Sequence, residues 1–198
     1  MKRFLALALI LMMLFSLCAC GRQDKMYIEK AKLTKAEESI VRLLGAAHGS
    51  ELIYDYKVDK NAKTMQINSY ELVDGEWQMI SGGGGLAMPD QEGRIALRFE
   101  KIGEDLRVAI QCGDDFSATE FRSAEALEEN LSHMSASITD QAAIEYEKEI
   151  PLAVQIATTK TEIRSFGPEY YFNPEEYAQY GYEHVYAITV MFSTEELG

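Results

Sequence analysis

Alternation of apolar and polar residues is the dominant pattern along the chain, and it predicts a fold rich in β-strands. A period of two residues is typical of a strand with one buried face. The pattern recurs in the segments 51–58, 63–72, 76–80, 93–100, 105–112, 116–121, 150–157, 161–166 and 182–192. Because short polar turns such as Asp74-Gly75 separate many of these segments, we expect them to pair in order as an antiparallel sheet.

Two other segments repeat their apolar residues every three or four positions, which predicts short amphipathic helices. The first begins at Thr34, which forms the pattern of a capping box with Glu37, and Gly45 is expected to end it. Its apolar face consists of Ala36, Ile40, Leu43, Leu44 and Ala47. The second helix is predicted over residues 123–134, with Ser123 as its cap and Leu127, Leu131 and Met134 on one face.

The segment from Val185 to Phe192 is apolar on both of its alternating faces, which favours a central strand that is covered on each side. A helix or a second sheet must therefore lie over each face. Together the patterns predict an α+β, β-rich fold, mainly an antiparallel sheet or sandwich-like, with two short helices. A single domain over residues 34–198 is expected, and the alternative is two small lobes split at the Gly-rich loop, residues 81–93.

Residues 1–19 have the layout of a secretory signal peptide. Lys2 and Arg3 precede an uncharged run from Phe4 to Leu17, and small residues follow. This run is too short to cross a bilayer, because a membrane-spanning helix needs about 20 apolar residues. A buried core helix is the alternative, and the charges at the very start of the chain argue against it.

The residues around the end of this segment, Leu17-Cys18-Ala19-Cys20, resemble the lipobox of bacterial lipoprotein precursors. A leucine lies three positions before the final cysteine, and a small residue lies directly before it. The resemblance implies that Cys20 receives a diacylglyceryl group and becomes the new N-terminus, and two acyl chains anchor a protein stably. Cys18 fits less well, because Leu17 would then directly precede the cleavage site. A zinc half-site is the alternative, but no C-x-x-C or His pair at ligand spacing follows.

The resemblance implies a lipoprotein at the extracytoplasmic face of the cell membrane. The Gly after Cys20 and the acidic body are similar to uncharacterised Gram-positive lipoproteins. Loss of Lys2 and Arg3 would make the formal net charge of −13 two units more negative, and such a surface repels nucleic acid. The stalk, residues 20–33, is instead rich in Lys and Arg, so we expect it to lie against anionic headgroups. A merely solvated stalk is the alternative.

Motifs that carry chemistry are weak in this sequence. Cys112 falls on the apolar face of a predicted strand and is expected to be a core residue. His48, His133 and His184 lie far apart in sequence, and Glu129 with His133 has a spacing that could supply two metal ligands but is more often an exposed polar pair. We therefore expect no metal, no cofactor and no assignable catalytic residue.

The segment from Phe166 to Tyr186 is rich in tyrosine, a residue that favours recognition surfaces because it offers contact area at little cost in side-chain entropy. The candidate binding residues are Tyr170, Tyr171, Phe172, Tyr177, Tyr180 and Tyr182. Rings flanked by acids suit a sugar or a peptide with basic groups. The alternative is that the segment folds back and covers the core.

The sequence thus favours a non-catalytic lipoprotein that binds an envelope glycan, peptide or protein partner. An extracytoplasmic hydrolase with dispersed catalytic residues is one alternative, and a His close to a Ser or Asp in a cleft would support it. A structural or assembly factor of envelope machinery is another, which differs only in having a protein as its partner.

Overall fold

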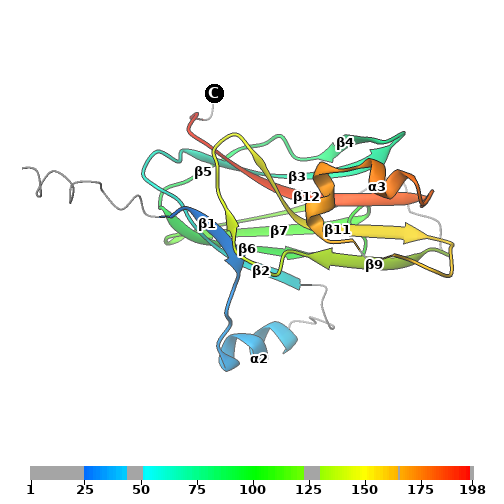
Figure 1. The fold of residues 1–198 in the computed structure, drawn as a ribbon. Helices are drawn as coiled ribbons and strands as arrows, with labels where there is room; N and C mark the ends of the chain where they lie inside the picture. The colour runs from blue at the N-terminus through cyan, green and yellow to red at the C-terminus, as the bar shows by residue number, and fades with distance from the viewer. Residues whose placement is uncertain (1–24, 44–50, 123–129, 165, 197–198) are drawn as a thin grey trace, which may run out of the picture.

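Two antiparallel β-sheets packed face to face form the body of the molecule (Figure 1). The computed structural model describes residues 25–43, 51–122, 130–164 and 166–196. Sheet A has the strand order β10-β1-β2-β6-β7-β8, and sheet B has the order β4-β3-β12-β11-β9, with β5 paired to β3. The predicted β-rich, sandwich-like α+β fold is therefore confirmed.

The strand bounds follow most of the alternating segments closely. The strands of sheet A are β10 (Ala142–Ala143), β1 (Tyr27–Lys30), β2 (Glu51–Lys57), β6 (Glu92–Arg98), β7 (Asp105–Cys112) and β8 (Asp115–Arg122). Those of sheet B are β4 (Glu76–Ser81), β3 (Thr64–Val73), β12 (His184–Ser193), β11 (Glu149–Thr158), β9 (Ser132–Ser137) and β5 (Leu86–Ala87). The helices are α2 (Lys35–Leu43), the 3-10 helix η1 (Pro168–Phe172) and α3 (Glu175–Ala178).

The turn at Asp74-Gly75 joins β3 to β4, as the sequence predicts. Both residues have positive φ, 53° and 84°, which is the conformation of a two-residue type I′ hairpin turn. Val73 and Glu76 pair directly across it. In sheet A, β6, β7 and β8 form successive hairpins in the same antiparallel manner.

The main core lies between the two sheets and is built from alternate residues of the facing strands. In β7, for example, Leu106, Val108 and Ile110 are buried. Tyr54 of β2 bridges the two layers, because its hydroxyl donates a hydrogen bond of 2.9 Å to the carbonyl of Leu152 on β11. Residues from before and after the Gly-rich loop contribute to this core.

Strand β12 is buried on both faces, as predicted from its continuous apolar sequence. It lies between β3 and β11, and one of its faces points into the main core. The other face, with Val185 and Ala187, belongs to a second apolar cluster that also contains rings of the Tyr-rich segment. The segment with η1 and α3 thus forms a layer over the outer face of sheet B (Figure 1).

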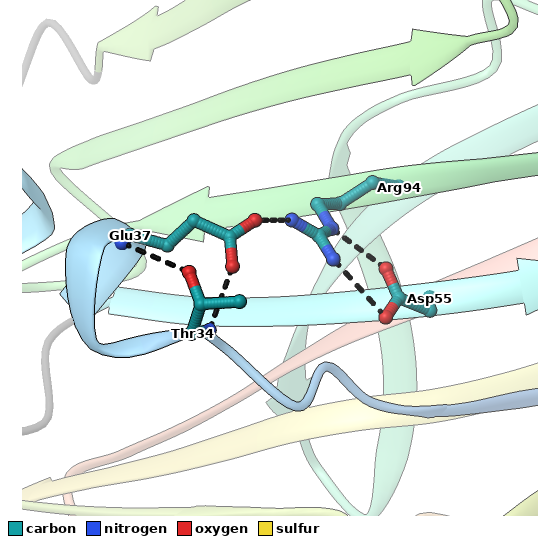
Figure 2. Close-up of polar contacts among 4 residues, drawn as sticks. All are labelled: Thr34, Glu37, Asp55 and Arg94. Atoms are coloured by element: carbon teal, nitrogen blue, oxygen red, sulfur yellow. Dashed lines mark hydrogen bonds and ion pairs between the residues drawn. The ribbon is translucent and has the colours of Figure 1, made fainter.

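Helix α2 begins with the predicted capping box (Figure 2). The backbone N–H of Thr34 donates to Glu37 Oε2 at 2.7 Å, and the N–H of Glu37 donates to Thr34 Oγ1 at 3.3 Å. Arg94 of β6 donates to Glu37 Oε1 at 3.0 Å and also binds Asp55 of β2. No residue of α2, Lys35–Leu43, is buried, so polar contacts are prominent in holding this helix against sheet A.

Two predicted elements differ from the structure. Residues 161–164 and 166 form no strand, and the backbone N–H of Arg164 donates to the Tyr182 hydroxyl instead of to a neighbouring strand. The helix predicted over 123–134 is wrong for Ser132–Met134, which belongs to β9 and pairs with β11, because sheet pairing outweighs local helical spacing. Residues 44–50 and 123–129, which include the expected end of the first helix and start of the second, lie outside the described residues.

The Gly-rich loop is fixed against β3. Gly82 has a φ of 128°, and a Cβ at this position would lie 2.3 Å from Asn68 Oδ1, so only glycine fits. The N–H of Gly83 donates to Asn68 Oδ1 at 3.0 Å, and β5 then pairs with β3. The loop therefore holds the side chain of Asn68 in one orientation.

Candidate functional site

Most of the six candidate binding residues lie in the layer that covers sheet B. Tyr177 is fully buried, with 0% of its surface exposed. The partly buried candidates are Tyr170, Tyr171, Tyr180 and Tyr182. Phe172, at the end of η1, is 62% exposed. Phe172 is thus the candidate with the largest free surface for a ligand.

Ring packing explains why the other candidates are internal. The ring centroid of Tyr177 lies 5.0 Å from that of Phe166 and 6.1 Å from that of Trp77, and Tyr171 stacks on Trp77 at 5.1 Å. The indole N–H of Trp77 donates to the carbonyl of Tyr171 at 2.8 Å. Aromatic pairs of this kind contribute about 0.5–1.5 kcal/mol beyond their burial. The cluster therefore fixes η1 on the sheet and leaves Phe172 at the surface.

Tyr180 and Tyr182 also have partners within the chain. Their rings stack with centroids 5.7 Å apart. The guanidinium of Arg164 lies 5.7 Å from the ring centroid of Tyr180, and the ammonium of Lys160 lies 5.6 Å from that of Tyr182. The cations that such rings attract are thus supplied by the protein itself.

A pocket of about 310 Å³ lies beside η1 and is termed here the Glu149 pocket. Its apolar wall consists of Ile138, Ala142, Ala143, Ile150, Pro151 and Phe172. Its charged residues are Glu145, Lys148, Glu149 and Glu169. Since Lys148 pairs with Glu145 at 2.5 Å, the carboxylates of Glu149 and Glu169 leave the pocket with an excess of negative charge.

One carboxylate oxygen of Glu149 is engaged and the other is not. Oε1 accepts hydrogen bonds from Asn68 Nδ2 at 2.9 Å and from the Tyr70 hydroxyl at 2.8 Å. Oε2 is buried and has no hydrogen-bond partner among the residues that the structure describes. Leaving a buried acceptor unpaired costs free energy. A cationic donor that displaces the groups covering this oxygen would satisfy it with a charge-assisted hydrogen bond.

The partners of Glu149 are themselves held in place. Asn68 is 1% exposed and is fixed by Gly83, while the Tyr70 ring lies 5.7 Å from that of Tyr171. Burial, together with the hydrogen bond to Glu149, raises the pKa of Tyr70, so its hydroxyl stays protonated and able to donate. Glu149 is therefore oriented before any ligand arrives, which lowers the cost of binding.

The two histidines of the described residues, His133 and His184, form no hydrogen bond to a Ser or an Asp there. His184 Nδ1 lies 2.7 Å from Glu71 Oε1. Burial lowers the pKa of His133, whose Nδ1 is buried without a partner in the described part of the chain. Cys112 is 2% exposed, and no cluster of three or more His, Cys, Asp or Glu within residues 25–43, 51–122, 130–164 and 166–196 could hold a metal ion.

Sequence reasoning missed Glu149 and the wall of the pocket at residues 138–151. Glu149 follows Lys148 at the start of an apolar strand, where it resembles an ordinary solvated charge. The available signal was Pro151 two residues later, at the irregular register of β11. The role of Glu149 arises from tertiary pairing, which brings it to Asn68 across 81 residues of sequence.

None of the described helices has the length and apolar character required to span a bilayer. No model of a protein family matches the chain, and neither a curated protein nor a solved structure does. Function must therefore be inferred from the residues themselves.

Proposed function

We propose that this protein is a membrane-anchored extracytoplasmic lipoprotein that binds a ligand at the cell envelope through the Glu149 pocket, without catalysis. The anchor is supported by the lipobox-like residues Leu17 to Cys20 and by the short apolar run before them. The binding function is supported chiefly by one observation: Glu149, whose buried Oε2 has no hydrogen-bond partner among the described residues, lines a pocket with apolar walls.

The chemistry of the pocket favours a ligand that carries a cation next to an apolar group. Glu149 offers an acceptor for an ammonium or guanidinium group, and Phe172 and Ile150 offer surfaces for an apolar one. The volume of about 310 Å³ suits a single side chain or a small amine. A basic peptide, or an envelope component that bears an amine, has this chemistry.

A protein partner that inserts a Lys or Arg side chain would use the same pocket. The alternative of a structural or assembly factor of envelope machinery therefore differs from the proposal in the identity of the ligand and not in the position of the site.

The anchor is tested by replacing each cysteine of the lipobox in the precursor. Mass spectrometry of the wild-type protein and of Cys18→Ala, the matched control, is expected to find a diacylglyceryl group at the N-terminal Cys20 and both proteins in the membrane fraction. The Cys20→Ala variant is expected to lack the lipid. A lipidated Cys20→Ala variant, or wild-type protein without lipid, would contradict the anchor.

The pocket is tested by a thermal-shift screen of a soluble chain that starts at Gly21, against short basic peptides, amines, cell-wall glycans and divalent cations. A ligand that binds only the folded state at a hundredfold excess over its dissociation constant stabilises it by about 2.7 kcal/mol. Phe172→Ala, which removes part of the apolar wall, is expected to reduce the shift. Phe116→Ala, which removes a ring that is 69% exposed on β8 of sheet A, is the control. A shift that is unchanged in Phe172→Ala, or that only divalent cations produce, would contradict the proposal.

A further inference from the structure

Helix α2 presents apolar side chains to solvent. Ile40 is 57% exposed and Leu43 is 83% exposed. Glu37 and Val41, which lie one turn apart, are the partly buried residues of this helix, and Glu37 is the one that binds Arg94 of sheet A. With 3.6 residues per turn, Ile40 and Leu43 lie about a quarter turn or more from this contact side. The apolar side of α2 is therefore not packed on the sheet.

The charges around this apolar side are mainly basic. Lys32 precedes the helix, Lys35 opens it and Arg42 lies in its last turn, and all three are exposed. Of the two acids in α2, Glu37 is engaged by Thr34 and Arg94, and the other is Glu38. The whole chain, by contrast, carries a formal net charge of −13. The helix thus combines exposed apolar residues with cations on a molecule that is otherwise acidic.

The chain connects α2 closely to the proposed anchor. Tyr27, the first residue of β1, lies seven positions after Cys20. Seven residues span at most about 25 Å when fully extended, and β1 leads through residues 31–34 into α2. A lipid on Cys20 would therefore keep α2 near the bilayer surface.

We infer that α2 docks on the bilayer surface, with Ile40 and Leu43 at the boundary of headgroups and acyl chains and with Lys32, Lys35 and Arg42 facing anionic phosphates. The inference rests on the proposed lipid anchor at Cys20, which supplies the proximity. Interfacial helices bury their apolar side in this way, and basic residues strengthen the binding to anionic lipids. Docking would turn the outer face of sheet A toward the membrane.

This orientation has a consequence for the ligand site. α2 lies on the outer side of sheet A, whereas η1, with Phe172 at its end, covers the outer face of sheet B (Figure 1). Docking through α2 would therefore place the η1 layer on the side of the molecule that faces away from the bilayer. The Glu149 pocket lies beside this layer at the edge of the sandwich, because its wall also includes Ala142 and Ala143 of β10, the edge strand of sheet A that pairs with β1.

The test uses the full lipidated protein in vesicles of phosphatidylglycerol and phosphatidylcholine in equal parts. An environment-sensitive fluorophore is attached to Ile40→Cys or, as the matched control on the polar side of the same helix, to Glu38→Cys. Cys112 is 2% exposed and is expected to stay unlabelled. Spin-labelled lipids are expected to quench the fluorophore at position 40 severalfold more than the one at position 38. Replacing Lys32, Lys35 and Arg42 by Gln is expected to reduce this difference.

Three outcomes would contradict docking of α2 on the bilayer. Equal quenching at both positions in protein that carries its lipid would overturn docking and leave the anchor intact. Protein without lipid at Cys20 would overturn both the anchor and the docking that depends on it. Disulfide cross-linking of two unlabelled Ile40→Cys copies, together with an absence of lipid quenching in the labelled protein, would instead assign the apolar side of α2 to an interface between copies.

Discussion

The two outer faces of the sandwich carry covers of opposite kinds. The cover on sheet B is aromatic and internal: Tyr177 of α3 is fully buried within it and Phe166 is 6% exposed. The cover on sheet A is helix α2, in which no residue is buried. A groove of about 400 Å³, lined by Val41 of α2 and by Ile53 and Ala96 of sheet A among others, lies at this contact. The Tyr-rich segment is therefore packed into the body of the molecule, whereas the amphipathic helix α2 keeps its apolar side exposed.

The strands beneath explain this difference. The outer face of β12 is apolar, with Val185 and Ala187, and it must be covered because exposed apolar area is costly. The outer face of sheet A instead carries charged residues such as Asp55 and Arg94, which can stay in contact with water. The cover there matches charge, since the Glu37 carboxylate pairs with Arg94, while Val41 of α2 lines a groove together with Ile53 and Ala96.

The largest expected effect is on the aromatic cover. Tyr177→Ala should reduce the free energy of unfolding by about 3–5 kcal/mol, because it removes a buried ring and leaves a cavity. Leu43→Ala in α2 should change it by no more than about 0.5 kcal/mol, as is usual for an exposed side chain. Urea denaturation of both variants, in the chain that starts at Gly21, measures the two values. Similar losses would show that the two covers do not differ.

A second effect concerns the loop that supports Asn68 in sheet B. Gly82→Ala should destabilise the fold by about 1–3 kcal/mol, because alanine is strained at a φ of 128° and its Cβ would meet Asn68. Gly84→Ala is the matched control, since a Cβ there would have no neighbour within 4 Å. Thermal unfolding of the two variants should separate them clearly. Equal melting temperatures would mean that the loop does not constrain Asn68.

A smaller effect concerns the charges that hold α2. Hydrogen bonds from Thr34, reinforced by Arg94, lower the pKa of Glu37 from 4.5 to about 2. Because the pKa is lower in the folded state, the stabilisation by this carboxylate is complete above about pH 4.5 and is lost as the pH falls toward 2. Arg94→Met should raise the pKa of Glu37. The pH range over which the stabilisation is lost should then become narrower.

An NMR titration of the Glu side-chain carboxyl carbons measures this change. Glu183 is the internal control, because hydrogen bonds from Thr158 and Thr159 lower its pKa to about 2 without any contribution from Arg94. Arg94→Met should leave the titration of Glu183 unchanged. If Glu37 titrated in Arg94→Met as it does in the wild-type protein, the Glu37–Arg94 ion pair would play no part in holding α2.

The smallest change in stability is expected for Phe172, which we assign to ligand contact, although it lies in the same segment as the buried rings of the cover. Phe172→Ala should change the free energy of unfolding by no more than about 0.5 kcal/mol, because this ring is 62% exposed. It should nevertheless weaken binding in the Glu149 pocket. Comparing its urea denaturation with that of Tyr177→Ala tests this division. A loss of several kcal/mol would assign Phe172 to the cover as well.

Sequence patterns predicted those parts of the fold that depend on local order. The two-residue period located β7 and β12, the positive-φ turn at Asp74-Gly75 joined β3 to β4, and the Thr34–Glu37 capping box started α2. Ser132–Met134 was predicted wrongly, because its partner β11 lies about 20 residues away along the chain and overrides the helical spacing.

The candidate site depended on contacts that no local pattern contains. Composition marked the segment with Tyr170, Tyr171 and Tyr177, but it could not separate rings that face sheet B from Phe172, which faces solvent. Glu149 acquires its environment from Asn68 and Tyr70 on β3, far away in sequence. Pockets of this kind arise from strand order, which alternation alone does not define.

Pairing of Glu149 with a cation in an apolar pocket can be measured by NMR titration of the chain that starts at Gly21, with phenethylamine and with its neutral analogue 2-phenylethanol. The amine is expected to shift the signals of Ala142, Ala143 and Phe172 in the wild-type protein. It should bind Glu149→Gln about tenfold to a hundredfold more weakly, as expected for loss of a charge-assisted hydrogen bond, while the alcohol should bind both proteins weakly. Equal affinity of the amine for both proteins, or shifts confined to residues away from the pocket, would show that Glu149 does not bind the cation.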